Sequence, residues 1–244
     1  MKITILSDIH ANLEALETVM VESERMGVNK FISLGDVVGY GPDPVGCINR
    51  LREVKATLIA GNHDLALIDT NQIRLFNPFA RPSLFHAVEE VGRKELDYLA
   101  SQFAVYYGKN ELSLGAFAHS DPIEPLKMKP LYLVDSVIEF FELIQNKVTF
   151  VGHTHTPSIY CKVRDSVQTL TSSMFAVGPH KYLVNPGSVG QPRDGDVRAS
   201  YAIWDTEQNN IQIKRTEYPF RKTQEKMLKI GFPLYTIERL ASGE

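Results

Sequence analysis

The sequence repeatedly places Asp, Asn and His residues directly after short apolar runs, and this pattern constrains the fold more than any other feature. The run Thr57–Ala60 leads into Gly61-Asn62-His63-Asp64. Apolar runs of this length, bounded by turn residues, are typical of buried strands. The carboxyl ends of parallel strands meet at one edge of a sheet, so we expect these side chains to lie close together. Similar arrangements occur at Ser7-Asp8-Ile9-His10, Gly35-Asp36, His119 and Gly152-His153-Thr154-His155.

The length and charge of the chain exclude several broad classes of protein. With 244 residues, 43% of them hydrophobic, we expect residues 1–244 to form a single domain. A net charge of −3 argues against a general nucleic-acid or membrane partner. No apolar run approaches the ~18 residues of a membrane span. We expect no signal peptide, because the first strand begins at Lys2. Cys47 and Cys161 form no disulfide or zinc pattern, so a cytoplasmic location is expected.

The first part of the chain predicts alternating strands and helices. A helix over Asn12–Met26 should be capped by Asn12, and a second should open at Asp43-Pro44 with a capping carboxylate. A βαβαβ start of this kind implies parallel strands with right-handed crossovers. The expected strands are Lys2–Ser7, Lys30–Leu34 and Ala56–Ala60.

The remainder predicts a helical excursion followed by antiparallel strands. Residues from 65 to about 102 should form the excursion over the site, with a helix over Ala87–Ser101. A hairpin is expected over Tyr106–His119 with its turn at Gly108-Lys109-Asn110, and another at Asn209-Asn210. We therefore predict an α/β fold in which two packed sheets form an αββα sandwich. Further helices are expected over Val134–Gln145 and Lys222–Ile230, and further strands over Ser158–Val163, Val167–Thr171, Lys181–Val184, Ser200–Asp205 and Ile211–Arg215.

The polar residues after the strands have the composition of a dinuclear metal site. Imidazole, carboxylate and amide ligands without thiolates suit Mn, Fe, Zn, Ni or Co better than Mg or Ca. If Asp36 is shared, with its two carboxylate oxygens bridging two cations, the set divides into two sites of equal size. Two cations about 3.5–4 Å apart are a device for phosphoryl transfer. An isolated Asp-x-His is more often a turn, and His86 and His180 follow no apolar strand, so we interpret both as structural. The predicted ligands are Asp8, His10, Asp36, Asn62, His119, His153 and His155.

The order of these motifs resembles that of the calcineurin-like metallophosphoesterases. The segment Asn185–Arg193 also resembles their small bacterial and archaeal branch. The resemblance implies a two-sheet sandwich with a dinuclear centre. It also implies that His63 protonates the leaving group and that Asp64 orients His63. By motif, the first metal would be held by Asp8, His10, Asp36 and His155, and the second by Asp36, Asn62, His119 and His153.

Two departures from the Ser/Thr protein phosphatase branch disfavour protein phosphatase activity. The block Gly35–Gly41 has no arginine, and the next block ends in Asp64 where that branch has Glu. Phosphate recognition is therefore expected from other residues. Arg193 is the first candidate, and the alternative is a surface arginine that caps a turn. Tyr40 could line the site or serve only as a packing aromatic. The predicted substrate-binding residues are Asn62, His63, Arg193 and Tyr40.

These features predict a metal-dependent phosphoesterase, either a phosphatase or a phosphodiesterase, that acts on a small phosphorylated substrate. One alternative is a nuclease or cyclic-nucleotide phosphodiesterase, although no Lys/Arg cluster accompanies the motifs. Another is a non-catalytic scaffold, which should have lost metal ligands or His63. The sequence makes no prediction of the oligomeric state.

Overall fold

Two six-stranded sheets form the centre of the molecule in the computed structural model, which describes residues 1–109, 115–120 and 134–244. The first sheet has the order β3-β2-β1-β11-β12-β9 and the second the order β4-β5-β6-β10-β7-β8. The first contains β1 (Lys2–Leu6), β2 (Lys30–Ser33), β3 (Thr57–Leu58), β9 (Met174–Ala176), β11 (Ala199–Asp205) and β12 (Asn210–Thr216). The second contains β4 (Val105–Tyr107), β5 (Gly115–Ala118), β6 (Val148–Phe150), β7 (Ser158–Val163), β8 (Ser166–Thr169) and β10 (Lys181–Asn185).

Each sheet combines parallel and antiparallel pairs. In the first sheet β1 pairs in parallel with β2, and β2 with β3, whereas β1 pairs antiparallel with β11. In the second sheet β5, β6 and β10 are parallel neighbours. The strands that precede the predicted ligands, β1, β2, β3, β5 and β6, all take part in these parallel pairs, as expected.

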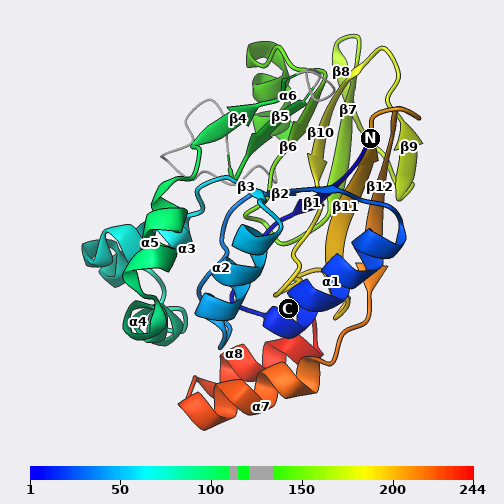
Figure 1. Ribbon diagram of the computed structural model, residues 1–244. Helices are drawn as coiled ribbons and strands as arrows, with labels where there is room; N and C mark the ends of the chain where they lie inside the picture. The colour runs from blue at the N-terminus through cyan, green and yellow to red at the C-terminus, as the bar shows by residue number, and fades with distance from the viewer. Residues whose placement is uncertain (110–114, 121–133) are drawn as a thin grey trace.

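The helices lie outside the two sheets (Figure 1), which confirms the predicted αββα sandwich. One core cluster packs α1 and α2 on the first sheet, and another packs α6 on the second. Within the described ranges, no helix has the length and apolar character of a membrane span. The helices are α1 (Leu13–Arg25), α2 (Pro44–Glu53), α3 (Asn62–Ile68), α4 (Arg81–Glu90), α5 (Arg93–Ala100), α6 (Val134–Leu143), α7 (Phe220–Ile230) and α8 (Leu234–Glu238), with 3₁₀ turns at Thr70–Leu75 and Arg239–Ala241.

The core between the sheets contains a cluster of three aromatic rings among aliphatic side chains. Trp204 of β11 is fully buried and contacts Phe117 of β5 and Phe150 of β6, at ring-centre distances of 6.3 and 5.6 Å. Phe117 and Phe150 stack at 5.4 Å. These rings fix the distance between the sheets, whose strand ends carry the polar residues.

Several local predictions need correction. The helix expected over Ala87–Ser101 is two helices, because α4 ends at Glu90 and α5 begins at Arg93. Asp43 precedes α2 but makes no capping hydrogen bond with its side chain. Its carboxylate instead contacts Lys226 of α7 at 2.8 Å. The short elements β9 and α8 were not predicted. The turn expected at Gly108-Lys109-Asn110 lies partly outside the described residues.

Candidate metal centre

The loops that follow β1 and β2 carry the first ligands and are joined through their backbones. The N–H of Asp8 donates to the carbonyl of Gly35 at 3.1 Å, and the N–H of His10 donates to the carbonyl of Asp36 at 2.9 Å. Ladder-like bonds therefore continue beyond the parallel strands. They place Asp8, His10 and Asp36 on adjacent loops at the carboxyl edge of the first sheet, as predicted.

The backbone at most of the predicted ligands is left-handed. The φ angles are 51° at Asp8, 49° at His10, 52° at Asp36, 69° at His153 and 60° at His155. This conformation costs a non-glycine residue about 1–2 kcal/mol. Such strain persists only where the surrounding structure imposes it, and it is concentrated at functional sites. The left-handed backbone therefore lowers the stability of the fold while it directs these side chains inward.

Two imidazoles present lone pairs to each other at the centre of the site. Nδ1 of His10 lies 3.0 Å from the carbonyl of Val38, and Nδ1 of His155 lies 2.6 Å from the carbonyl of Gln191. Because a carbonyl only accepts hydrogen bonds, both Nδ1 atoms are the donors. In the neutral rings both Nε2 atoms are then acceptors, and they lie 3.0 Å apart. Two facing lone pairs repel unless a cation or a proton lies between them.

A second group of acceptors surrounds His119. Its Nδ1 donates to the carbonyl of Leu34 at 2.8 Å, so its Nε2 carries the lone pair when the ring is neutral. This Nε2 lies 3.0 Å from Nδ1 of His153, 3.3 Å from Oδ1 of Asn62 and 3.4 Å from Oδ2 of Asp36. His119 follows β5 and Asn62 opens α3, so the two sheets meet at this group.

Asp36 lies between the two groups and presents one oxygen to both. Its Oδ1 accepts the N–H of His63 at 2.9 Å. Its Oδ2 lies 3.7 Å from Nε2 of His10 and 3.4 Å from Nε2 of His119. The sequence indicated a bridge through both carboxylate oxygens. The structure instead directs Oδ2 alone toward both groups.

Asp8 completes the first group. Its Oδ2 accepts the hydroxyl of Ser7 at 2.5 Å and the N–H of His153 at 3.0 Å. Its Oδ1 is buried, has no hydrogen-bond partner within residues 1–109, 115–120 and 134–244, and lies 3.4 Å from Nε2 of His155. Burial raises the pKa of Asp8 to about 6. A buried carboxylate oxygen with no hydrogen-bond donor is unfavourable unless a positive charge lies beside it.

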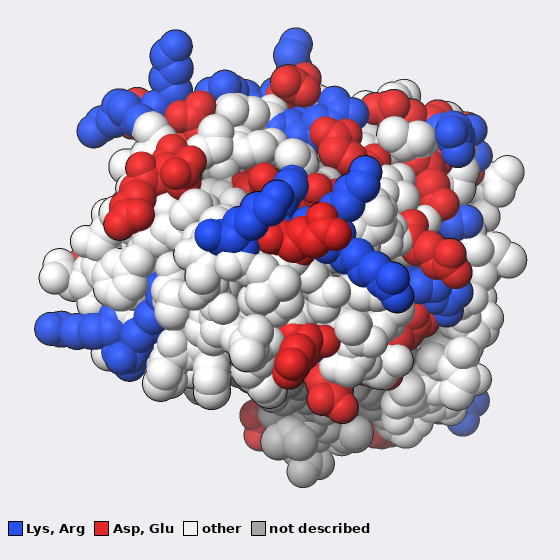
Figure 2. Space-filling model, turned by 90° about the horizontal axis from the view of Figure 1, so that it is seen from below, with Lys and Arg blue, Asp and Glu red and all other residues white. Residues whose placement is uncertain are grey.

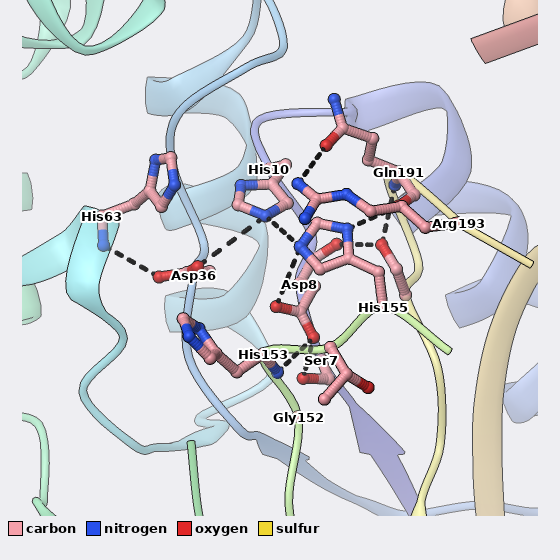
Figure 3. Close-up of polar contacts among 12 residues, drawn as sticks. Ser7, Asp8, His10, Asp36, His63, Gly152, His153, His155, Gln191 and Arg193 are labelled. Atoms are coloured by element: carbon pink, nitrogen blue, oxygen red, sulfur yellow. Dashed lines mark hydrogen bonds and ion pairs between the residues drawn. The ribbon is translucent and has the colours of Figure 1, made fainter. Parts of the chain in front are cut away.

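Groups of these side chains could hold divalent cations. Figure 3 shows Asp8, His10, Asp36, His153 and His155 gathered around one region. Asp8, His10 and His155 bring one ligand atom each to a common point, and so do Asp36, His119 and His153. Buried imidazole and carboxylate ligands with no thiolate are typical of Mn, Fe, Zn, Ni or Co. The imidazoles of His10, His119 and His155 are each oriented by a hydrogen bond to a backbone carbonyl, as metal-binding histidines usually are. The His–His contacts, which repel in the neutral rings, become favourable when a cation lies between them.

Glycines allow the loops to approach this closely. A Cβ atom at Gly61 would lie 2.1 Å from the backbone nitrogen of Asp36, and one at Gly152 would lie 1.8 Å from Oγ of Ser7. Both contacts are shorter than any non-bonded contact to Cβ. The glycines in these motifs are therefore required by the geometry of the site.

The chain is similar to known proteins over nearly its whole length. Residues 1–209 match the calcineurin-like phosphoesterase superfamily domain. The chain is 33% identical over 243 residues to the uncharacterized protein MJ0912 of Methanocaldococcus jannaschii, covering 99% of this chain and 98% of that protein.

The chain belongs to the calcineurin-like phosphoesterase superfamily.

Among solved structures, a metallophosphoesterase from Sphaerobacter thermophilus is 34% identical, with a TM-score of 0.86 and 100% of both chains covered. The hypothetical protein PH1004 of Pyrococcus horikoshii shares the fold, with a TM-score of 0.80 at 19% identity, covering 100% of this chain and 98% of that one. The family and fold support a phosphoester hydrolase that uses divalent metal ions. Further residues of this chain surround the candidate metal ligands.

His63, the candidate proton donor of this phosphoesterase, lies in an aromatic surround. Its ring centre lies 4.8 Å from that of His10, 4.9 Å from that of Tyr40 and 4.7 Å from that of Phe76. Its Nδ1 is buried and has no hydrogen-bond partner in the described part of the chain. Burial lowers the pKa of His63 to about 4. The imidazole is therefore neutral at neutral pH in the free protein. Sequence reasoning did not find Phe76, because an aromatic residue in a turn-rich segment carries no distinctive signal.

Asp64 does not make the expected contact with His63. Its Oδ1 accepts the N–H groups of Val37 and Val38, at 2.9 and 3.2 Å. Its Oδ2 accepts from Gln102 at 3.2 Å. Burial raises the pKa of Asp64 to about 7. We therefore correct the predicted orienting role: Asp64 holds the loop after β2 against α3, and His63 is positioned by ring packing.

Arg193 extends from the loop after β10 toward His10, beside His155 (Figure 3). Its guanidinium lies 5.5 Å from the ring centre of Tyr40 and donates to Oε1 of Gln191 at 2.8 Å. The structure therefore brings both sequence candidates, Arg193 and Tyr40, to the centre. Both also have structural contacts: the hydroxyl of Tyr40, for example, accepts a hydrogen bond from Asn77.

The two histidines interpreted as structural are absent from these ligand groups. His86 lies on α4, where its Nε2 is 3.1 Å from the carbonyl of Pro42 and its ring packs on Phe232. His180 immediately precedes β10.

Proposed function

We propose that this protein hydrolyses small phosphate esters at a centre of two divalent transition-metal ions. The Nε2 atoms of His10 and His155 face each other at 3.0 Å. The buried Oδ1 of Asp8, which has no hydrogen-bond partner among the described residues, lies beside them. This arrangement is the observation that carries the proposal. Asp8, His10, Asp36 and His155 would hold one ion. The other would be held by Asp36, Asn62, His119 and His153.

When bound, such ions lower the pKa of a water toward ~7 and neutralise charge on the phosphate. The remaining work falls to the side chains of this chain. Arg193 supplies a fixed positive charge beside the metal centre, suited to a phosphoryl oxygen. Phe76 and Tyr40 shield His63 from solvent. In the reaction the oxygen of water bonds to phosphorus while the bond from phosphorus to the leaving oxygen breaks.

His63 donates the proton that the leaving oxygen needs. Burial keeps the imidazole neutral in the free protein, with a pKa of about 4. A bound phosphate places negative charge beside the ring, which favours the imidazolium. His63 would therefore gain its proton with the substrate and lose it to the leaving group. The proton that the water loses returns to solvent and balances the exchange.

The proposed substrate is small and cytoplasmic. On the face seen from below, where α7 and α8 lie, Lys and Arg are interspersed with Asp and Glu (Figure 2). Lys226, for example, contacts Glu14 at 2.6 Å and Asp43 at 2.8 Å. Basic residues paired in this way do not offer a continuous path for a nucleic-acid backbone, so we favour a small phosphorylated compound.

The proposal is tested by hydrolysis with purified protein reloaded with Mn. We expect cleavage of p-nitrophenyl phosphate or its bis-p-nitrophenyl diester, which also separates monoester from diester preference. On an alkyl phosphate, whose leaving alkoxide needs a proton, His63→Ala should lower kcat by about 10²–10⁴-fold, and His180→Ala, outside the ligand groups, should leave it unchanged. Absence of hydrolysis of both p-nitrophenyl esters by metal-loaded protein would refute the proposal. Full turnover of the alkyl phosphate by His63→Ala would refute the assigned proton donor.

A further inference from the structure

A series of aromatic and guanidinium groups runs from the metal centre to the surface. It begins at His10, whose ring centre lies 4.8 Å from that of Tyr40. The guanidinium of Arg193 lies over the Tyr40 ring, 5.5 Å from its centre. These residues come from loops after three different strands, β1, β2 and β10. The series therefore starts inside the site that the proposed function requires.

The C-terminal segment continues the series. Arg239 lies over Tyr235 of α8, 5.3 Å from its ring centre. Tyr235 in turn packs on Phe79, which precedes α4, with ring centres 4.9 Å apart. Tyr235 is 50% exposed and Phe79 is 47% exposed. Two half-exposed aromatic rings in contact form a platform at the edge of the site.

The C-terminal segment is fixed against the loop that carries Arg193. The N–H of Gly195 donates to the carbonyl of Gly243 at 2.9 Å. Met227 and Leu240 also line a cavity of about 10 Å³ together with His10. The placement of Arg239 relative to the metal centre is thus set by backbone bonding and by packing.

Arg193 and Arg239 lie within electrostatic range of each other, and Arg239 also lies within range of the Glu244 carboxylate. Burial, and then the charge of Arg193, lower the pKa of Arg239. In the part of the chain that the structure describes, neither forms an ion pair: Arg193 donates to Oε1 of Gln191, and Arg239 to the carbonyl of Glu244. Nε of Arg193 is buried and has no hydrogen-bond partner among the residues that the structure describes. Two neighbouring guanidinium groups favour an anion between them.

We propose that this series is a subsite for a nucleoside diphosphate or a longer nucleotide. One phosphate lies at the metal centre, the next contacts Arg193 and Arg239, and the base stacks on Tyr235 and Phe79. This inference rests on the proposed function and specifies its substrate class. Stacking suits an exposed aromatic pair because every base has a π face.

The inference is tested by calorimetry with two matched ligands on Mn-loaded protein. α,β-Methylene-ADP carries the base and two phosphorus groups, and methylenediphosphonate carries the two phosphorus groups alone. We expect the nucleotide to bind at least about tenfold more tightly, from stacking of one base. Tyr235→Ser should remove that difference. Arg239→Gln should weaken both ligands about tenfold or more, through loss of a charge-assisted contact.

Two exposed residues elsewhere serve as matched controls. Arg93→Gln on α5 changes an arginine that pairs only with Asp97, and Tyr107→Ser changes a 58% exposed tyrosine on β4. Neither should alter either affinity. Equal binding of the two ligands, or unchanged nucleotide affinity in Tyr235→Ser, overturns the inference. Because binding is measured without turnover, failure of the subsite is distinguished from failure of ester hydrolysis, which the p-nitrophenyl esters report.

Discussion

Replacing Gly39 by alanine should disable the proton donor without touching a metal ligand. Gly39 has a φ of +85°, and a Cβ atom placed there would lie 2.2 Å from Nδ1 of His63. An ordinary van der Waals contact begins near 3.4 Å, so the ring must move by more than 1 Å. His63 packs on Phe76, at 4.7 Å between ring centres, and cannot shift without displacing it.

The magnitude follows from two separable effects. Left-handed backbone at alanine costs about 1 kcal/mol, which lowers Tm by roughly 2–4 °C in a chain of this size. Displacement of a general acid costs about 10²–10⁴-fold in rate. Gly27 separates the two effects, because its φ is +76° and nothing lies within 4 Å of a Cβ placed there. Gly27→Ala should therefore match the loss of Tm and leave the rate intact.

The assay compares two esters that differ in their need for a proton. p-Nitrophenolate leaves readily without protonation, whereas the alkoxide of an alkyl phosphate does not. We expect Gly39→Ala to lose about 10²-fold or more in kcat on the alkyl ester and much less on the p-nitrophenyl ester, with metal content unchanged. Equal losses on both esters, or a profile identical to that of Gly27→Ala, would refute the argument that Gly39 makes room for the acid.

Two other predictions concern the metal centre. Gly61→Ala should destabilise the protein by about 1–3 kcal/mol in urea unfolding and lower its metal content, because its Cβ would lie 2.2 Å from Oδ1 of Asp36. Gly92→Ala is the matched control, since both glycines precede helices in extended backbone and Gly92 meets only the flexible carboxylate of Glu95, at 3.0 Å; equal losses in the two variants would contradict this account. Metal affinity should rise with pH between about 5 and 9, because burial raises the pKa of Asp8 to about 6 and the pKa of His119 is about 9. Burial opposes a charged His119, but the charge and hydrogen bond of Asp36, the charge of Asp8 and the hydrogen bond to Leu34 together raise its pKa. A group whose folded pKa is raised stabilises the metal-free fold in its protonated form, and metal binding must displace that proton. Calorimetry of Mn binding in buffers of different ionisation enthalpy should therefore show proton release at pH 7. Absence of proton release would count against these ligands.

The gathering of the candidate ligands was largely predictable because it depends on a pattern that is local in sequence. Each group of candidate ligands follows an apolar run, and parallel strands deliver their carboxyl ends to one edge. The sequence alone therefore indicated that Asp8 and His10 lie at this edge. The orientation of the two carboxylate oxygens of Asp36 could not be predicted, because it depends on the N–H of His63, which approaches from the start of α3.

Features set by long-range contacts were not predictable. Asp43 has the local signature of a capping residue, yet its carboxylate contacts Lys226, which is far away in sequence. Asp64 has the position of a residue that orients His63, yet it binds the backbone N–H groups of the loop after β2. In both cases a tertiary partner competes with the local one for the same carboxylate. The unpredicted α8 has only the five residues Leu234–Glu238, too few for a periodic signal.

The most direct test of the central claim is anomalous diffraction from crystals of the protein loaded with Mn. The account predicts two peaks about 3.5–4 Å apart, with Oδ2 of Asp36 between them and Nε2 of His10 and of His119 on opposite sides. A single peak, or two peaks elsewhere with hydrogen-bonded water between the imidazoles, would contradict it.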